Sequence, residues 1–207
     1  MAVALLQYSC LGPILFVLFI NDLPDVFTDT VTLKLYADDV KLYSNIKTSS
    51  LDTAADLQKQ LDKLAMWAEI WQLPISYSKC CVLPLGKYHS GSVQLFTIND
   101  HNILPVEQAV DLCVSVDREM KISLHITNIS RKAHNRANLI IRCFHSKNIQ
   151  SLIASYKVYV RPILEYSSVA WNPYLIKDIK ALESVQRRFT KRLPGMEKLT
   201  YHQCLRV

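Results

Sequence analysis

The chain opens with a short apolar run that is bounded by proline-containing turns. The run extends over residues 13–20 and is followed by Asn-Asp-Leu-Pro at 21–24. A proline is tolerated in the first turn of a helix, and a polar segment with a second proline ends one. The pattern predicts a short buried helix. Asp22 and Asp25, in the turn that follows, are interpreted as capping residues.

Strict alternation of apolar and polar side chains marks the next segment. Residues 31–36 read Val-Thr-Leu-Lys-Leu-Tyr, and the alternation resumes at Val40 after Ala37-Asp38-Asp39. This period of two is typical of a β-strand with one buried face. We therefore expect a β-hairpin over residues 31–43, with Asp38 and Asp39 at its tip.

Helical spacing replaces the alternation from residue 51 to residue 71. The apolar positions that form one stripe are Leu57, Leu61, Leu64, Ala68 and Trp71. Pro74 is expected to end this helix. Trp67 and Trp71 lie one turn apart, and we interpret both as packing residues rather than as surfaces for base stacking.

The remainder of the chain changes from β-like to helical patterns. Short β-like runs at 80–83, 93–98, 103–106 and 112–116 predict a small antiparallel sheet, with a turn at Asn99-Asp100. Apolar stripes within 126–140, 152–160 and 179–189 then predict three helices. Together these patterns indicate an α+β fold class.

Charge divides the chain at nearly the same place. Residues 1–117 contain 7 Lys/Arg and 13 Asp/Glu, a net charge of −6, whereas residues 118–207 contain 17 and 5, a net charge of +12. We therefore expect a domain boundary near residue 118. The basic half indicates an anionic partner, most simply nucleic acid, because neutralised phosphates release counterions. A set of basic, solvated helices with no such partner is the alternative.

Several classes of protein are disfavoured by composition. The six cysteines show neither C-x-x-C spacing nor the Cys/His clusters that hold zinc, and we interpret them as reduced thiols. The apolar run at 11–20 is about half the length of a membrane-spanning helix. No Lys or Arg precedes this run, as a signal peptide would require. We expect an intracellular protein that is neither secreted nor inserted in a membrane.

The adjacent carboxylates of Asp38 and Asp39 are the candidate chemical centre. Mg²⁺ prefers carboxylate oxygens, and a tight turn lets two side chains reach one site. Two metal ions held in this way can stabilise the attacking and leaving oxygens of a nucleotidyl transfer. A solvated polar turn is the alternative interpretation of an Asp-Asp pair on its own.

The surroundings of this pair resemble a known family. Tyr36-Ala37-Asp38-Asp39 between two apolar strands resembles the active-site hairpin of reverse transcriptases. The segments that resemble non-LTR, jockey-like retrotransposon enzymes in the family's order lie at 7–16, 21–24, 67–73, 78–80, 85–86, 111–117, 161–166, 171–173 and 183–188. The resemblance covers nearly the whole chain.

This resemblance implies the end of a polymerase palm in residues 1–117 and a basic helical thumb in residues 118–207. Such an enzyme extends a DNA primer on an RNA template from nucleoside triphosphates, with Mg²⁺ or Mn²⁺ as cofactor. Asp38 and Asp39 would be the metal ligands. Lys79 matches a palm lysine that could give a proton to the leaving pyrophosphate. An exposed structural lysine is the alternative for this residue.

Two further groups of residues are implicated in binding. The residues that match the stretch around the nucleotide and template pocket are Gln7, Ser9, Gly12, Pro13 and Tyr36. The basic residues that lie opposite the apolar stripe of the last long helix are Arg187, Arg188, Lys191 and Arg192. We expect these four side chains to project into solvent together and to bind phosphates, and replacement of both Arg187 and Arg188 by alanine to weaken RNA or DNA binding and its salt dependence.

The chain also departs from the family pattern. Tyr8 stands where the family has a glycine that allows close approach to the nucleotide, Cys113 where it usually has glycine in the primer-grip turn, and Ser76 where it usually has asparagine. The family's third metal-binding aspartate and its fingers lie upstream, whereas only six residues precede Gln7. The 207 residues alone are therefore expected not to extend a primer.

Three interpretations of function remain open at the level of sequence. The chain could act as a polymerase by itself, although two carboxylates without fingers give a poorly defined metal site. It could bind nucleic acid through its basic half without catalysis. It could also be a translated relic of a mobile element that has no function.

Overall fold

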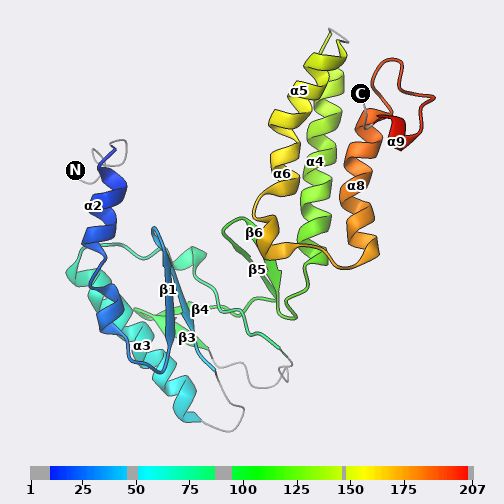
Figure 1. The fold of residues 1–207 in the computed structure, drawn as a ribbon. Helices are drawn as coiled ribbons and strands as arrows, with labels where there is room; N and C mark the ends of the chain where they lie inside the picture. The colour runs from blue at the N-terminus through cyan, green and yellow to red at the C-terminus, as the bar shows by residue number, and fades with distance from the viewer. Residues whose placement is uncertain (1–9, 46–50, 87–94, 146–147, 205–207) are drawn as a thin grey trace. The chain divides into compact units, whose positions relative to one another are not determined.

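A computed structural model describes residues 10–45, 51–86, 95–145 and 148–204. The chain divides into two compact units, Met1–Val82 with His89–Pro105 and Leu83–Tyr88 with Val106–Val207. Helices alternate with short antiparallel hairpins, so the expected α+β class is confirmed (Figure 1). None of the described helices has the length and apolar character needed to cross a membrane.

The described residues of the first unit form two helices, two short 3-10 helices and two hairpins. In chain order its elements are α2 (Gly12–Phe19), η1 (Leu23–Val26), β1 (Thr32–Tyr36), β2 (Asp39–Tyr43), α3 (Leu51–Ile70), η2 (Tyr77–Lys79), β3 (Phe96–Ile98) and β4 (His101–Ile103). The long helix α3 carries residues of both apolar clusters of this unit.

The helix α2 forms where the sequence predicts it, but its expected burial is wrong. No residue of α2 is buried, and Leu18 and Ile14 are 66% and 59% exposed. All positions after Pro13 in this helix are apolar, so it has no polar face to turn toward water. Phe16 packs beside Leu23 and Trp67, whereas the other sides of α2 are not covered by residues that the structure describes.

The hairpin β1–β2 agrees with its prediction. The strands pair in antiparallel register from Thr32↔Tyr43 to Tyr36↔Asp39, which leaves a two-residue turn. Leu35 packs beside the cluster that contains Trp67, and Leu42 packs beside the cluster that contains Phe96. The hairpin is therefore held by apolar contacts of its inward side chains.

The helix α3 is buried along two neighbouring stripes. Ala54, Leu61 and Ala65 pack against Phe96 and Ile103 of the β3–β4 hairpin. Further along the helix, Trp67 and Ala68 pack against Ile20 and Leu23. The interpretation of Trp67 as a packing residue is confirmed. Trp71 is 37% exposed and meets the ring of Phe19 edge-on, with centroids 4.9 Å apart. The chain leaves the helix at Gln72, whose φ is 54°, before it reaches Pro74.

The expected small sheet is in fact a set of separate two-stranded hairpins. Asn99 and Asp100 form the predicted turn between β3 and β4, and both have a positive φ. The run at 80–83 forms no strand and contributes one bridge, between Val82 and Pro105. Turn residues recur every few positions in this region, so that each pair of strands closes before a third strand can join.

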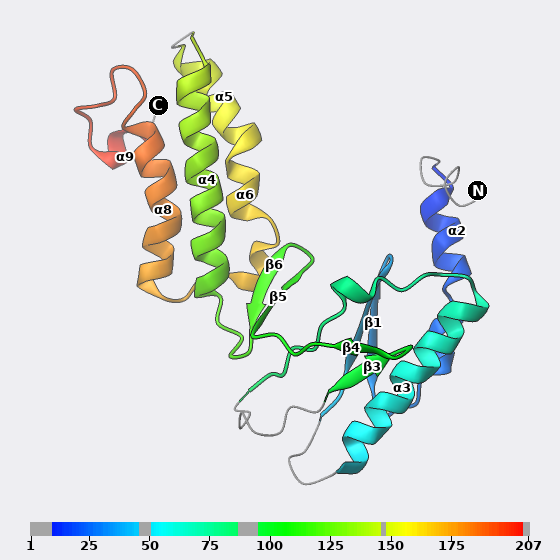
Figure 2. The ribbon, with the colours of Figure 1, turned by 180° about the vertical axis from the view of Figure 1, so that it is seen from behind.

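The second unit begins with a hairpin and continues with helices. Its elements are β5 (Gln108–Asp111), β6 (Val114–Asp117), α4 (Ser123–Cys143), α5 (Ile149–Tyr159), α6 (Arg161–Glu165), α7 (Ser168–Trp171), α8 (Ile176–Thr190) and α9 (Tyr201–Cys204). Within this unit α4 lies between α5–α6 on one side and α8 on the other (Figure 2). The three long helices confirm the predicted stripes.

The compact units divide before β5, not near residue 118. The β5–β6 hairpin packs on the first turns of α4, because Val114 joins the cluster formed by Ile126, Ile129 and Trp171. The hairpin is acidic and β-rich like the segment before it, but its Val114 is partly buried against the helices. The change in charge along the sequence thus places the domain boundary near residue 118, whereas the contacts between residues place it before β5.

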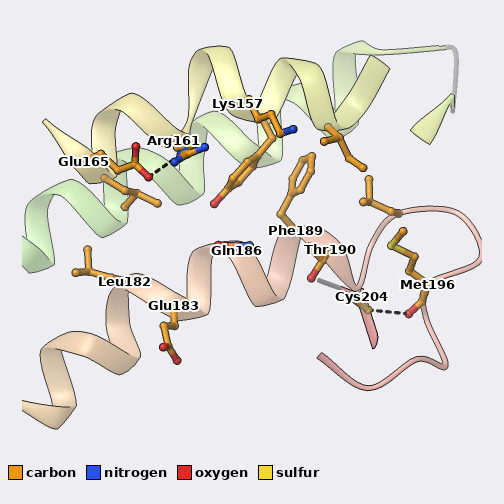
Figure 3. Close-up of a pocket in the computed structure, with 14 residues that line it drawn as sticks. Lys157, Arg161, Glu165, Leu182, Glu183, Gln186, Phe189, Thr190, Met196 and Cys204 are labelled. Atoms are coloured by element: carbon orange, nitrogen blue, oxygen red, sulfur yellow. Dashed lines mark hydrogen bonds and ion pairs between the residues drawn. The ribbon is translucent and has the colours of Figure 1, made fainter. Parts of the chain in front are cut away.

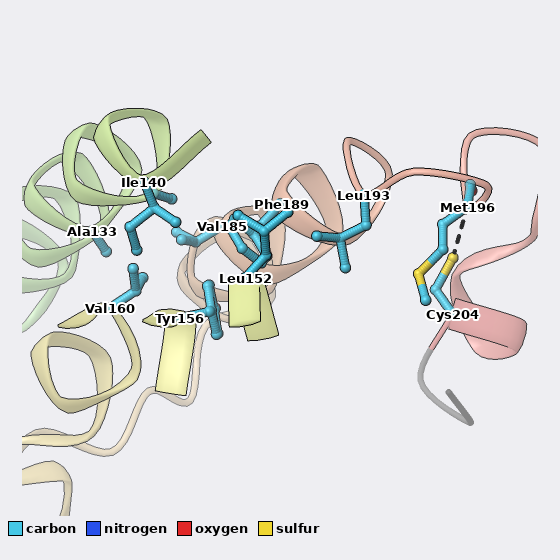
Figure 4. Close-up of a cluster of buried hydrophobic side chains, with 11 residues drawn as sticks. Ala133, Ile140, Leu152, Tyr156, Val160, Val185, Phe189, Leu193, Met196 and Cys204 are labelled. Carbon is cyan, nitrogen blue, oxygen red and sulfur yellow. Dashed lines mark hydrogen bonds between the residues drawn. The ribbon is translucent and has the colours of Figure 1, made fainter. Parts of the chain in front are cut away.

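The core of the helical unit is continuous along α4. Ala133, Ala137 and Ile140 pack with Tyr156 of α5 and Phe189 of α8, whose ring centroids are 4.6 Å apart (Figure 4). Four of these five residues are less than 6% exposed. Replacement of Phe189 by alanine would therefore cost about 3–5 kcal/mol.

Candidate active site and basic helical face

The hairpin β1–β2 presents two carboxylates at its end. Ala37 and Asp38 form the turn, and Asp39 is the first residue of β2, paired with Tyr36. Ala37 has a φ of 50°, in the left-handed region, which lets the chain reverse within two residues. Asp38 and Asp39 are both exposed. The local sequence thus places two adjacent acidic groups where a solvent-borne ligand can reach them.

These two side chains fit part of the ligand set of Mg²⁺ or Mn²⁺. Magnesium in phosphoryl-transfer sites is commonly held by one or two carboxylates, with substrate phosphates and water completing an octahedron. Among the described residues no group of three or more His, Cys, Asp or Glu side chains could hold a metal ion. Asp38 and Asp39 would therefore share the metal with substrate oxygens and water.

Asp22 has a structural contact instead of a cap. It stands at the N-cap position of η1, yet its side chain makes no capping hydrogen bond. Its Oδ1 accepts a hydrogen bond from Nε1 of Trp67 over 3.3 Å. The capping interpretation is therefore wrong for Asp22. Asp25, in the first turn of η1, is exposed.

The other candidates from the sequence are spread over the first unit. Gln7, Ser9 and Tyr8 lie outside the described residues. Gly12 and Pro13 form the first turn of α2, and Lys79 is exposed at the end of η2. The structure brings Tyr36 together with Asp39 as a cross-strand pair. Lys79 makes no ion pair with either aspartate of the hairpin within the described part of the chain.

A second feature is a basic face formed by α4 and α8. His134 Nε2 lies 3.2 Å from Ser184 Oγ, and Arg192 donates a hydrogen bond to Asn138 Oδ1 over 2.5 Å. These contacts join the two helices along one edge. Burial, and then the charge of Arg188, lower the pKa of His134, so Arg188 also lies on this edge. The histidine is thereby kept neutral beside the arginines near pH 7.

Helical spacing extends this edge into a continuous surface. Arg131 and Arg142 lie two turns before and one turn after Asn138, and therefore on the same side of α4. The exposed residues that make up the basic face are Arg131, Arg142, Arg188, Lys191 and Arg192. The acidic groups of the neighbouring helices are engaged elsewhere: Glu165 with Arg161, Glu183 with Arg187, and buried Asp178 with the hydroxyl of Ser123.

Of the four basic residues predicted on the last long helix, Arg187 and Arg188 lie in α8, whereas Lys191 and Arg192 follow its end at Thr190. All four are exposed, as expected. Arg187, however, turns away from α4: its Nη2 lies 4.0 Å from Glu183 Oε2, and its guanidinium lies 4.8 Å from the ring centre of Tyr201. The sequence patterns did not identify His134 and Asn138 as residues of a binding site. Their spacing of four residues beside the apolar stripe of α4 is the signal that could have indicated a helix-facing polar edge.

The turn between β5 and β6 carries one of the departures from the family pattern. Leu112 and Cys113 both have a positive φ, 43° and 66°. Left-handed backbone of this kind favours glycine, because a Cβ atom crowds the following carbonyl. The structure therefore gives a physical reason for the glycine that the family resemblance leads us to expect at position 113, and this chain forms the turn with cysteine.

Comparison with known proteins agrees with this arrangement. The family model for reverse transcriptase (RNA-dependent DNA polymerase) matches residues 7–106, which include the whole β1–β2 hairpin. The chain is 27% identical over 198 residues to the RNA-directed DNA polymerase from mobile element jockey of Drosophila melanogaster, a match that covers 91% of this chain and 21% of that protein. No solved structure matches the chain.

Two further relatives come from other mobile elements of Drosophila melanogaster. The probable RNA-directed DNA polymerase from transposon X-element is 24% identical over 221 residues, covering 97% of this chain and 23% of the relative. The corresponding protein from transposon BS is 26% identical over 196 residues, covering 88% and 21%. The chain thus spans about a fifth of the length of the curated relatives it matches.

Residues 7–106, which contain the aspartate-tipped hairpin, match the reverse transcriptase family. The matches along the rest of the chain are to jockey-like elements. The chain is therefore related to the reverse transcriptases of non-LTR, jockey-like mobile elements, as the motifs in its sequence indicated.

Proposed function

We propose that this chain forms part of the palm and thumb of an RNA-directed DNA polymerase of a mobile element. In that enzyme a DNA primer is extended on an RNA template from deoxynucleoside triphosphates. The observation that carries the proposal is the two-residue turn that presents Asp38 and Asp39, exposed and adjacent, at the end of the β1–β2 hairpin. The family match over the same residues supports it.

Each group at the site has a definite part in this proposal. The carboxylates of Asp38 and Asp39 hold Mg²⁺ or Mn²⁺, and a metal bound there neutralises charge on the triphosphate and on the attacking oxygen. Tyr36, paired with Asp39 and 64% exposed, borders the nucleotide pocket together with Gly12 and Pro13. Lys79 supplies a proton to the departing pyrophosphate.

The basic α4–α8 face gives the second unit its role. It presents five cations on one side of two packed helices, and phosphate groups of a template–primer duplex are the anions that such a surface attracts. The second unit therefore acts as a thumb that holds the duplex, while the first unit carries the metal-binding residues.

Binding of Mn²⁺ tests the proposal directly. The electron paramagnetic resonance signal of free Mn²⁺ falls when the ion is bound, so a titration gives the number and strength of sites. We expect a site in the chain that is lost in the Asp38→Asn/Asp39→Asn variant. The matched control is Asp25→Asn/Asp29→Asn, which removes the same charge from exposed positions of the same unit. Equal binding by the two variants would contradict the proposal.

A second candidate function is nucleic-acid binding without catalysis. The contacts that form the basic face all lie within the second unit, so this surface does not depend on the hairpin. Under this alternative the chain binds a labelled duplex with salt-dependent affinity, and the Asp38→Asn/Asp39→Asn variant binds Mn²⁺ as the unaltered chain does.

A further inference from the structure

The helical unit contains a groove that the proposed polymerase function does not use. It lies between α5–α6 and α8 and has a volume of about 690 Å³ (Figure 3). The buried rings of Tyr156 and Phe189 pack together beneath it, with centroids 4.6 Å apart, and Ile153, Leu164 and Leu182 line it as partly buried apolar side chains. The groove therefore combines an apolar floor with access from solvent.

The dimensions of the groove are those of a helix. Its lining residues extend from Ile153 to Glu165 on one wall and from Leu182 to Leu193 on the other, and Met196 and Cys204 also line it. At 1.5 Å per helical residue each wall is roughly 17 Å long, or about three turns. Ala133 of α4 belongs to the same apolar cluster as Tyr156 and Phe189, so α4 supports the floor of the groove from below.

Charge is distributed unequally between the two rims. Lys157 and Arg161 stand one turn apart on the α5–α6 rim, and Arg161 is joined to Glu165 by a 2.6 Å ion pair. The α8 rim carries Glu183 and the neutral Gln186. The basic α4–α8 face is separate, because its Arg188 and Arg192 lie on the α4 side of α8.

We propose that this groove binds an amphipathic α-helix of a partner protein. The apolar ridge of the helix would lie against the partly buried Ile153, Leu164 and Leu182, and an acidic flank of the helix would lie along Lys157 and Arg161. A nucleic acid fits less well, because the floor is apolar and Glu183 stands on the opposite rim. A grooved, half-apolar surface bordered by charge is a usual receptor for such helices. The inference does not rest on the polymerase function.

A designed peptide serves as the probe. It has about 18 residues, enough for the length of the groove, with leucine at i, i+3, i+4 and i+7, glutamate along one flank and lysine along the other. Fluorescence anisotropy of the labelled peptide with the whole 207-residue chain should show binding in the micromolar range. A second peptide with lysine on both flanks should bind about tenfold more weakly, because it places like charges beside Lys157 and Arg161.

Variants of the chain localise the binding. Lys157→Glu, at an exposed position, should lower the affinity for the first peptide by about threefold to tenfold and raise the affinity for the second. Lys180→Glu makes the same charge change at an exposed position of α8 that does not line the groove, and it should leave both affinities unchanged. Leu182→Glu should abolish binding of both peptides.

Three results would overturn the proposal. The first is equal affinity of the two peptides for the unaltered chain. The second is an equal effect of Lys157→Glu and Lys180→Glu. The third is a concentration-dependent dimer in sedimentation experiments that Leu182→Glu abolishes, which would assign the groove to a second copy of the chain.

Discussion

The indole of Trp67 donates a hydrogen bond from Nε1 to Oδ1 of Asp22, 3.3 Å away and 45 residues earlier in the chain. The Trp67 ring is buried, whereas Asp22 is exposed. A buried indole N–H without an acceptor would cost free energy, so the carboxylate of Asp22 stabilises the packing of α3 on the turn after α2. This contact gives Asp22 a structural role.

Substitution of Asp22 separates that structural role from a role in metal binding. Asp22→Ala leaves the indole N–H without its acceptor and should lower the free energy of unfolding by about 1 kcal/mol. Asp22→Asn keeps an acceptor oxygen and should change stability by a few tenths of a kcal/mol at most. Urea unfolding measures the stability of both variants, provided that the m-value is the same as that of the unaltered chain. A large loss of Mn²⁺ binding in Asp22→Asn would contradict the structural assignment.

The β5–β6 turn provides a test of backbone strain. Cys113 holds a φ of 66°, which disfavours every residue with a Cβ atom. Cys113→Gly relieves this strain in the folded state but also raises the conformational entropy of the unfolded chain. Because the relief of strain is the larger effect, we expect a net gain in stability of about 0.5–1 kcal/mol. Cys113→Val should be destabilising, because a β-branched residue fits this conformation least well. If urea unfolding showed Cys113→Gly to be less stable than the unaltered chain, the positive φ assigned to Cys113 would be wrong.

The basic α4–α8 face leads to a prediction about salt dependence. Arg188→Ala/Lys191→Ala removes two exposed cations from the face, so affinity for a labelled RNA–DNA duplex should fall. The slope of the logarithm of the binding constant against the logarithm of the salt concentration is negative, and its magnitude should become smaller by about 2. The measurement is fluorescence anisotropy over a series of salt concentrations.

Arg187→Ala is the matched control for this prediction. Its guanidinium already faces Glu183 and the ring of Tyr201, so its removal should change the slope by less than removal of Arg188 alone. Identical slopes for Arg187→Ala and Arg188→Ala would remove the distinction between the two sides of α8.

The environment of His125 leads to a prediction of how the free energy of unfolding depends on pH. Its Nδ1 accepts a hydrogen bond from the backbone N–H of Ser115 over 3.1 Å, and burial followed by the charge of Lys132 lowers its pKa below 6.5. The unfolded chain therefore takes up a proton first as pH falls. The stability contribution is complete above about pH 6.5 and is lost as pH falls toward the lowered folded pKa.

Unfolding in urea at about pH 7.5 and about pH 5.5 tests this dependence. His125→Gln retains an acceptor for Ser115 but does not titrate, so its stability should fall less between the two pH values. His134, whose pKa is also lowered, accounts for a remaining decrease. The same decrease in His125→Gln as in the unaltered chain would show that His125 is already accessible to protons in the fold.

The parts of the fold that the sequence predicts well are those fixed by local periodicity. The stripe from Ile126 to Ile140 forms one buried face of α4, and the alternation around Asp38 forms the hairpin with the expected turn. Both patterns are set by side chains a few residues apart. The family motifs were readable for the same reason, because each is a short run of residues.

The parts that the sequence did not predict depend on long-range contacts. The burial of α2 requires neighbours that no local pattern specifies, and its apolar residues remain exposed in the described chain. The β5–β6 hairpin joins the helices through Val114, a contact with Trp171 that composition does not reveal. Arg187 lies apart from the basic face, with its guanidinium beside Glu183 of the same helix and over the ring of Tyr201 of α9.

The most direct test of the central claim is the position of bound Mn²⁺ on the chain. Paramagnetic Mn²⁺ broadens the amide resonances of residues near it, so NMR spectra recorded at low Mn²⁺ concentration locate the site without any assay of activity. The account predicts that Ala37, Asp38 and Asp39 broaden first, and that Asp38→Asn/Asp39→Asn abolishes this effect. Broadening that begins at Asp25 and Asp29, or that persists in the double variant, would contradict it.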